Sequence, residues 1–137
     1  HKFSVITMWD EWFHLYRKVL TEYKLESRCA SLRSINTRPD LEELLAGKEE
    51  VIFEKLEKES LRAIQEDGAD VIVLGSTTMH QSHGFLQQAL PVPVINPGLM
   101  SYKLCEMFLE TGLTHSKTAF PAPQQPNDQF ILSRVPD

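Results

Sequence analysis

Three consecutive hydroxyl residues, Ser76-Thr77-Thr78, follow a short apolar run that ends at Gly75. An apolar run closed by glycine and small polar residues is typical of a buried parallel strand. In open α/β sheets, ligands bind in the crevice beyond the carboxyl ends of such strands. Backbone N–H groups and hydroxyls in this loop could hold an anionic or carbonyl oxygen. The alternative is that the hydroxyls only cap the following helix.

Two further polar residues stand at the ends of predicted strands. Thr7 closes a β-branched, apolar run, and Asn96 follows a short run bracketed by prolines. Because the carboxyl ends of parallel strands meet at one edge of a sheet, both side chains could line the same crevice as Ser76. Thr7 could instead bond a local backbone group, and Asn96 could instead cap the next helix.

His80 and His83 are three residues apart, a spacing that could place both on one helical face as zinc ligands or as an acid/base pair. No third ligand of fitting spacing follows and HExxH is absent, so we expect no metal. His80 alone remains a candidate proton donor or anion partner. Cys29 and Cys105 are far apart and outside any CxxC pattern; we expect both to be packing residues in a reducing cytoplasm.

The elements that must position these residues alternate along the chain. Strands are predicted over residues 3–7, 29–35, 71–74 and 92–95. Helices are predicted over residues 10–23, 39–47, 49–67, 83–90 and 99–111, with Gly68 and Gly112 ending two of them. This alternation predicts an α/β fold with right-handed crossovers: a flavodoxin-like, three-layer lobe whose four-stranded parallel sheet has the order 2-1-3-4.

Length and composition limit the classes of function. The 137 residues suit one domain, with 42% hydrophobic and 24% charged residues. A net charge of -5 without a dense Lys/Arg block argues against nucleic-acid binding. No apolar run reaches the roughly 18 residues of a membrane span. Four of the eight prolines lie between Pro121 and Pro136, so we predict a lobe over residues 1–113 and an extended arm over residues 114–137.

The segments DGADVIVLGS, PVPVINP and TGLTHSK resemble the aspartate/glutamate/hydantoin racemase superfamily, and are most similar to its hydantoin and allantoin racemase branch. The resemblance is collinear over about residues 3–121. It implies two pseudo-symmetric α/β lobes with the substrate between them, each offering a cysteine at a strand end. One thiolate would remove the proton α to a carbonyl and the opposite thiol would return one, without a cofactor. This chain would then be the C-terminal lobe, with the N-terminal lobe missing.

Ser76 departs from the family pattern, because it stands where the resemblance places the second cysteine. An ordinary thiol has a pKa of about 8.5, whereas a serine hydroxyl is far less acidic and needs an adjacent base, which His80 could supply. Ser76 is either an engineered replacement, a native serine in a branch that works with one cysteine, or a sign of lost catalysis. We favour the second interpretation, because the three adjacent hydroxyls resemble a native oxyanion pocket.

The resemblance therefore implies a cytoplasmic, cofactor-independent racemase or isomerase of amino-acid metabolism. It would abstract a proton α to a carbonyl of a small carboxylate or cyclic amide. The predicted catalytic residues are Ser76 and His80, and the predicted substrate-binding residues are Thr7, Thr77, Thr78 and Asn96. A decarboxylase or lyase of the same superfamily, and a non-catalytic ligand-binding or maturation protein, remain the alternatives. Expected partners are a small-molecule substrate, the N-terminal lobe and a second copy in a homo-oligomer, but neither nucleic acid nor membrane.

Overall fold

The computed structural model describes residues 1–38, 49–125 and 127–134. The chain divides into two compact units, residues 1–103 and residues 104–137. The short helix predicted over residues 39–47 lies outside the described residues. Within the second unit, the arm predicted over residues 114–137 contains a helix, α6 (Asp128–Leu132).

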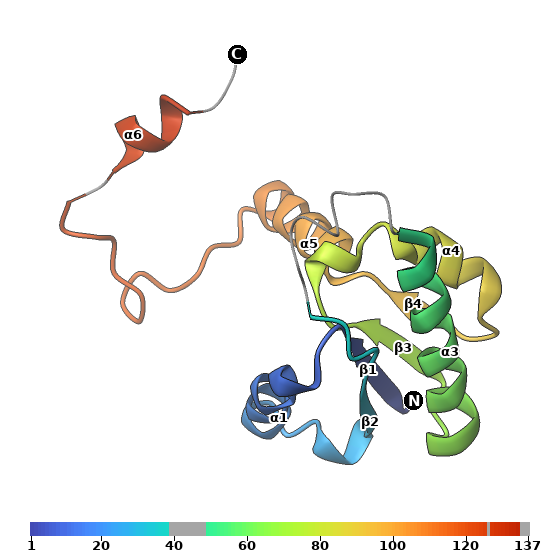
Figure 1. Ribbon diagram of the computed structural model, residues 1–137. Coiled ribbons are helices and arrows are strands. Elements are labelled where there is room, and N and C mark those ends of the chain that lie inside the picture. The colour runs from blue at the N-terminus through green and yellow to red at the C-terminus, as the bar shows by residue number, and fades with distance from the viewer. Residues whose placement is uncertain (39–48, 126, 135–137) are drawn as a thin grey trace. The chain divides into compact units, whose positions relative to one another are not determined.

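The first unit is built on a parallel sheet, as the sequence predicts (Figure 1). The order β2-β1-β3-β4 confirms the predicted 2-1-3-4 arrangement. Its strands are β1 (Phe3–Thr7), β2 (Cys29–Ser34), β3 (Val71–Leu74) and β4 (Val94–Ile95). The fourth strand begins later than predicted, because the prolines at positions 91 and 93 have no N–H to donate to the ladder.

Helices cover both faces of the sheet. In Figure 1, α1 lies on one side of the strands, and α3 and α4 lie on the other. This arrangement confirms the three-layer α/β lobe. The helical elements are η1 (Asp10–Trp12), α1 (Phe13–Glu22), η2 (Glu26–Arg28), α3 (Glu49–Asp67), η3 (Thr77–Met79), α4 (Ser82–Ala89) and α5 (Pro97–Thr111).

Strand and helix boundaries follow from burial and backbone conformation. Central strand β1 is buried from its second residue onward, whereas β2 is half-buried throughout, which explains why polar residues interrupt it. Gly68 and Gly112 have φ angles of +73° and +67° and end α3 and α5, as predicted. The core packs the sheet against α3 and α4 around a set of almost fully buried side chains: Ile6, Leu56, Ile72, Leu74 and Leu86.

An ion-pair cluster fastens edge strand β2 to α3. The Arg33 guanidinium donates to Asp67 at 2.6 and 2.9 Å and to Glu66 at 2.6 Å, and Glu59 lies at 3.4 Å. The Arg33 side chain is only 15% exposed. Hydrogen bonds from Arg33 lower the pKa of the Asp67 carboxyl below its ordinary value. These charges hold the outermost strand against its covering helix.

Over the described ranges, no helix is long and apolar enough to cross a membrane.

Candidate functional site

The loop after β3 is pressed against the end of β1. The Gly75 N–H donates to the Ile6 carbonyl oxygen at 2.7 Å. A Cβ atom on Gly75 would lie 2.8 Å from the Tyr16 hydroxyl and 3.0 Å from both the Ile6 oxygen and the Thr7 Cβ. A side chain at this position would therefore collide with backbone on one side and with a packed hydroxyl on the other. Only glycine allows β3 to end this close to β1.

Thr7 lies at this predicted edge of the sheet, beside the loop. Its side chain is fully buried, and its Oγ1 lies 3.1 Å from the Tyr16 hydroxyl oxygen. Tyr16, from α1, donates to the Gly75 carbonyl oxygen. Thr7 therefore contacts a neighbouring side chain, and a direct contact between Thr7 and substrate stays a prediction.

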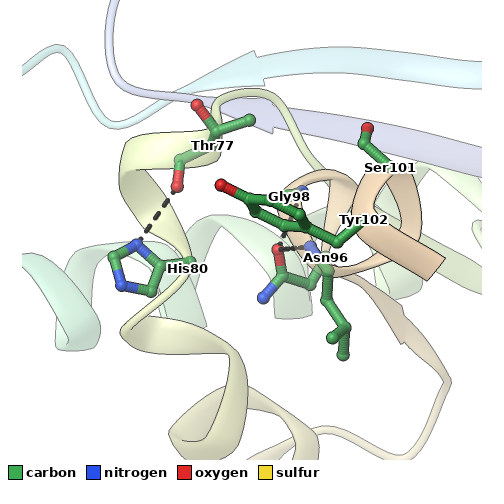
Figure 2. Close-up of a pocket in the computed structure, with 7 residues that line it drawn as sticks. Thr77, His80, Asn96, Gly98, Ser101 and Tyr102 are labelled. Atoms are coloured by element: carbon green, nitrogen blue, oxygen red, sulfur yellow. Dashed lines mark hydrogen bonds between the residues drawn. The ribbon is translucent and has the colours of Figure 1, made fainter. Parts of the chain in front are cut away.

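Three of the predicted site residues, Thr77, His80 and Asn96, line one cavity of about 610 Å³ (Figure 2). They come from η3, from the segment before α4 and from the loop after β4. The start of α5 completes the wall with Gly98, Leu99, Ser101 and Tyr102. The structure thus joins strand ends that are about 20 residues apart in sequence into one concave surface at the carboxyl edge of the sheet.

Tyr102 and Ser101 are site residues that the sequence analysis missed. Figure 2 shows the Tyr102 ring reaching from α5 with its hydroxyl directed toward Thr77. The Ser101 hydroxyl donates to the Pro97 carbonyl oxygen at 2.7 Å. The predicted cap could have indicated both residues, because a helix capped by Asn96 starts at the edge of the sheet and its first turns then lie beside the same crevice.

Ser76 lines a second cavity, of about 390 Å³, which is largely apolar and extends along the sheet beside α1. Thr77 borders both cavities. Ser76 is half-buried, and its carbonyl oxygen accepts from the Met79 N–H at 3.2 Å, which closes the η3 turn. The side chain of Thr78 lies outside the described part of the structure. Ser76 and His80 therefore flank the same short helix, η3, but line different cavities.

Asn96 caps helix α5. Its Oδ1 accepts from the Gly98 N–H at 3.1 Å and from the Leu99 N–H at 3.3 Å, and the side chain is only 8% exposed. In Figure 2, the amide nitrogen lies on the opposite side from these capped groups. Because the Asn96 Oδ1 already accepts these two hydrogen bonds, the –NH₂ group is the part of the side chain that can donate to a ligand.

The two histidines have different partners. His80 Nδ1 lies 3.2 Å from the Thr77 carbonyl oxygen. That contact places the proton of the neutral ring on Nδ1 and leaves Nε2 as a proton acceptor. His83 Nε2 lies 3.1 Å from the Val94 carbonyl oxygen and ties α4 to β4. In the described ranges, no group of three or more His, Cys, Asp or Glu residues is placed to hold a metal ion.

Neither Cys29 nor Cys105 is among the residues that line this cavity. Cys29 is half-buried in β2, burial raises the pKa of its thiol, and its Sγ donates to the Ser31 carbonyl oxygen at 3.5 Å. This environment agrees with the packing role that we expected for Cys29. Cys105 is exposed on α5, so the packing role predicted for it is wrong: the apolar neighbours in sequence do not enclose it.

A parallel α/β lobe with a cavity at the carboxyl ends of its strands is typical of proteins that bind small molecules. Residues 1–105 match the Asp/Glu/Hydantoin racemase family model, and the chain belongs to that family. This confirms the resemblance inferred from the three sequence segments.

Relatives of this chain are racemases. It is 34% identical over 117 residues to a hydantoin racemase of Rhizobium meliloti, covering 85% of this chain and 47% of that protein. Identity to a hydantoin racemase of Pseudomonas sp. (strain NS671) is 29% over 116 residues, covering 85% and 45%. The structure is similar to allantoin racemase from Klebsiella pneumoniae, with a TM-score of 0.81, 32% identity, and coverage of 91% of this chain and 50% of that one.

A second solved structure, allantoin racemase from Pseudomonas fluorescens, matches with a TM-score of 0.76 and 28% identity over 93% of this chain and 53% of that one. The chain thus spans about half the length of the relatives that it matches.

Proposed function

We propose that this chain supplies one wall of the active site of a cofactor-independent racemase that acts on a cyclic amide of the hydantoin or allantoin type. The observation that carries the proposal is the cavity at the carboxyl edge of the sheet, lined by Thr77, His80 and Asn96, in a member of the racemase family. The relatives named as hydantoin and allantoin racemases favour a cyclic amide over a simple carboxylate. A lobe equivalent to the other half of those relatives would supply the opposite wall.

The chemistry of such a site is proton transfer at the carbon α to a carbonyl. Removing this proton places negative charge on the carbonyl oxygen, so hydrogen-bond donors near that oxygen lower the barrier. The Asn96 –NH₂ and the hydroxyls of Thr77 and Tyr102 are donors that line the cavity. His80 Nε2 would accept or return the proton on this face, and the other wall would serve the opposite face. The proton taken from one face is replaced on the other, so the configuration inverts.

Ser76 favours a second candidate, a one-base decarboxylase or lyase. A hydroxyl at the position where the family resemblance places a thiol is a weak acid and a weak base, so one of the two proton-transfer positions would be lost. A reaction that needs protonation on one face only tolerates this loss. In a decarboxylation, the carbon–carbon bond breaks, CO₂ leaves, and the resulting enolate is protonated once.

Deuterium exchange separates these candidates. The protein that carries this chain together with the other lobe is incubated in D₂O with single enantiomers of 5-substituted hydantoins and of allantoin. NMR follows loss of the α-proton, and circular dichroism follows inversion. Exchange with inversion supports the racemase, and CO₂ release from a 2,2-dicarboxylate supports the decarboxylase. Neither reaction, with ligand binding retained, indicates a binding protein.

Variants of Ser76 test its role in the same assay. Ser76→Cys is expected to raise the exchange rate, and Ser76→Ala to lower it. Of the three side chains compared at position 76, only the thiol and the hydroxyl carry a proton that can take part in transfer. Ser27→Ala is the matched control, since Ser27 is exposed in η2 and lines neither cavity. Equal rates in all three variants would remove Ser76 from the mechanism. Stereoinversion by residues 1–137 alone at an enzymatic rate would overturn the two-lobe proposal.

A further inference from the structure

A short chain of hydroxyl groups connects helix α1 to the loop that carries Ser76. Tyr16 donates to the Gly75 carbonyl oxygen, and Thr7 Oγ1 lies 3.1 Å from the Tyr16 hydroxyl oxygen. Thr7 is fully buried and Tyr16 is half-buried. The three groups come from β1, α1 and the end of β3, which are adjacent only in the folded chain.

The donors in this chain can be assigned. A tyrosine hydroxyl has one proton, and in this structure that proton points to the Gly75 carbonyl oxygen. The Tyr16 oxygen is then an acceptor for the Thr7 hydroxyl. The order is therefore Thr7 to Tyr16 to Gly75, and each bond polarises the next.

The Tyr16 hydroxyl also occupies the space beside Gly75 that a side chain would need. A Cβ atom there would come within 2.8 Å of the hydroxyl oxygen. Gly75 is thus held on both sides: the Ile6 carbonyl oxygen accepts from its N–H at 2.7 Å, and Tyr16 donates to its C=O. The Gly75 C=O and the Ser76 N–H belong to the same planar peptide unit.

We infer that Tyr16 is a positioning residue for the Ser76 loop, and that it acts through the Gly75 carbonyl oxygen. Without the Tyr16 hydroxyl, the Gly75 carbonyl and the Thr7 hydroxyl both lose a partner inside a largely buried contact. The loop then rotates more freely about the bonds that aim Ser76 and Thr77 at the two cavities. The catalytic consequence rests on the proposed function, whereas the structural consequence does not.

Amide hydrogen exchange in the chain of residues 1–137 tests the structural part. Tyr16→Phe keeps the ring and removes the hydroxyl. The amides of Gly75 and Met79 are expected to exchange on the order of tenfold faster, the effect of losing one hydrogen bond. The Ile72 N–H, which donates to the Pro93 carbonyl oxygen at 2.9 Å, is the internal reference and is expected to be unchanged. Thr7→Val, which removes only the outer bond, is expected to show a smaller change.

Tyr23→Phe is the matched control. Tyr23 follows α1, is 67% exposed and lines neither cavity, so its exchange rates and activity are expected to equal those of the wild type. In the protein with both lobes, Tyr16→Phe is expected to lower kcat on the order of tenfold and to leave KM within about twofold. The reason is that Asn96 and Tyr102, which line the larger cavity and lie outside the Ser76 loop, would still bind the substrate.

Each outcome decides the inference. Faster exchange confined to Gly75 and Met79 supports positioning, and unchanged exchange overturns it. Equally faster exchange at Ile72 also overturns it, because the hydroxyl would then support the whole fold rather than the loop. Wild-type protein without activity on any hydantoin or allantoin would refute the proposed function, while the exchange result would still decide the role of Tyr16. A rise in KM with constant kcat would assign Tyr16 to substrate binding instead.

Discussion

The loop after β3 is held by uncharged groups, whereas edge strand β2 is fastened to α3 by charges. Around the loop, a tyrosine, a threonine and backbone amides supply the bonds. Between β2 and α3, Arg33 contacts three carboxylates. Of the described residues that line the larger cavity, none is Asp, Glu, Lys or Arg. The permanent charges therefore stabilise the contact between β2 and α3. The wall of the candidate site lacks these charged side chains, and its hydrogen-bonding groups can stabilise charge that develops on a ligand.

Gly75→Ala is expected to have the largest effect, because the added methyl group meets backbone at 3.0 Å and the Tyr16 hydroxyl at 2.8 Å. Overpacking of this kind lowers the free energy of unfolding by about 1–3 kcal/mol. Gly84→Ala is the control, since a Cβ there meets nothing within 4 Å and Gly84 lies in α4; it is expected to stabilise the fold. Urea denaturation of both variants checks the sign. A Gly75→Ala midpoint equal to that of the wild type would show that the loop yields.

Arg33→Met tests how much the ion pairs between β2 and α3 stabilise the fold. It keeps an apolar stem but removes the guanidinium that faces Asp67, Glu66 and Glu59. We expect a loss of about 1–2 kcal/mol, between the values for exposed and buried ion pairs, because Arg33 is 15% exposed. Arg62→Met removes a guanidinium that is 47% exposed and pairs with Glu59 and Glu66 on its own helix. It is expected to cost less than Arg33→Met, because water screens an exposed pair. Equal losses would mean that burial does not set the strength of the cluster.

Acid should weaken the β2–α3 contact but not the loop after β3. The pKa of Asp67 is lowered in the folded chain, first by hydrogen bonds from Arg33. The stability from Asp67 is therefore complete above its unfolded-state pKa of about 3.9, and is lost as the pH falls through the lower folded-state pKa. Urea midpoints of wild type and Asp67→Asn, measured from neutral pH downward, are expected to differ at neutral pH and to converge in acid. A constant difference would contradict this account.

Asn96→Asp is expected to have the smallest effect on stability, because an aspartate oxygen caps a helix as well as an asparagine oxygen does. It removes the –NH₂ donor and brings a negative charge to the cavity wall. Thermal denaturation should therefore change little, whereas binding of a hydantoin, measured by calorimetry, should weaken. Asn96→Ala, which removes the cap itself, is expected to cost about 1 kcal/mol. Unchanged hydantoin binding by Asn96→Asp would limit Asn96 to its capping role.

The parts of the fold that were predictable are those with a local pattern. The bounds of β1, α3 and β3 match the prediction because continuous apolar runs and a Gly68 cap define them. The structure shows the cap formed by Asn96, one of the two alternatives left open by the sequence, and ligand binding by its –NH₂ group stays a prediction. The sequence could not indicate that His83 reaches the Val94 carbonyl oxygen, because that contact depends on how α4 packs on β4.

The site was predictable as a location but not as a set of partners. Parallel topology brings strand ends together, and Thr77 and Asn96, which follow β3 and β4, line one cavity. Thr7, at the end of β1, lines neither of the two cavities described above. Tyr16 belongs to the apolar face of its helix in the sequence pattern. Only the contacts of its hydroxyl with Thr7 Oγ1 and the Gly75 carbonyl oxygen reveal a polar role. Likewise, the division into two cavities arises from side-chain packing, to which residue spacing gives no access.

Thr77 forms part of the wall of both cavities. A change in its size therefore alters two cavities at once: the larger one, whose wall includes His80 and Asn96, and the smaller one, which is largely apolar. Under the proposed function, a substitution at Thr77 would change contacts with the part of the substrate in the larger cavity and with any apolar substituent in the smaller one. Libraries intended to broaden the range of accepted molecules should vary Thr77 separately from its neighbours, so that gains in one cavity are not masked by losses in the other.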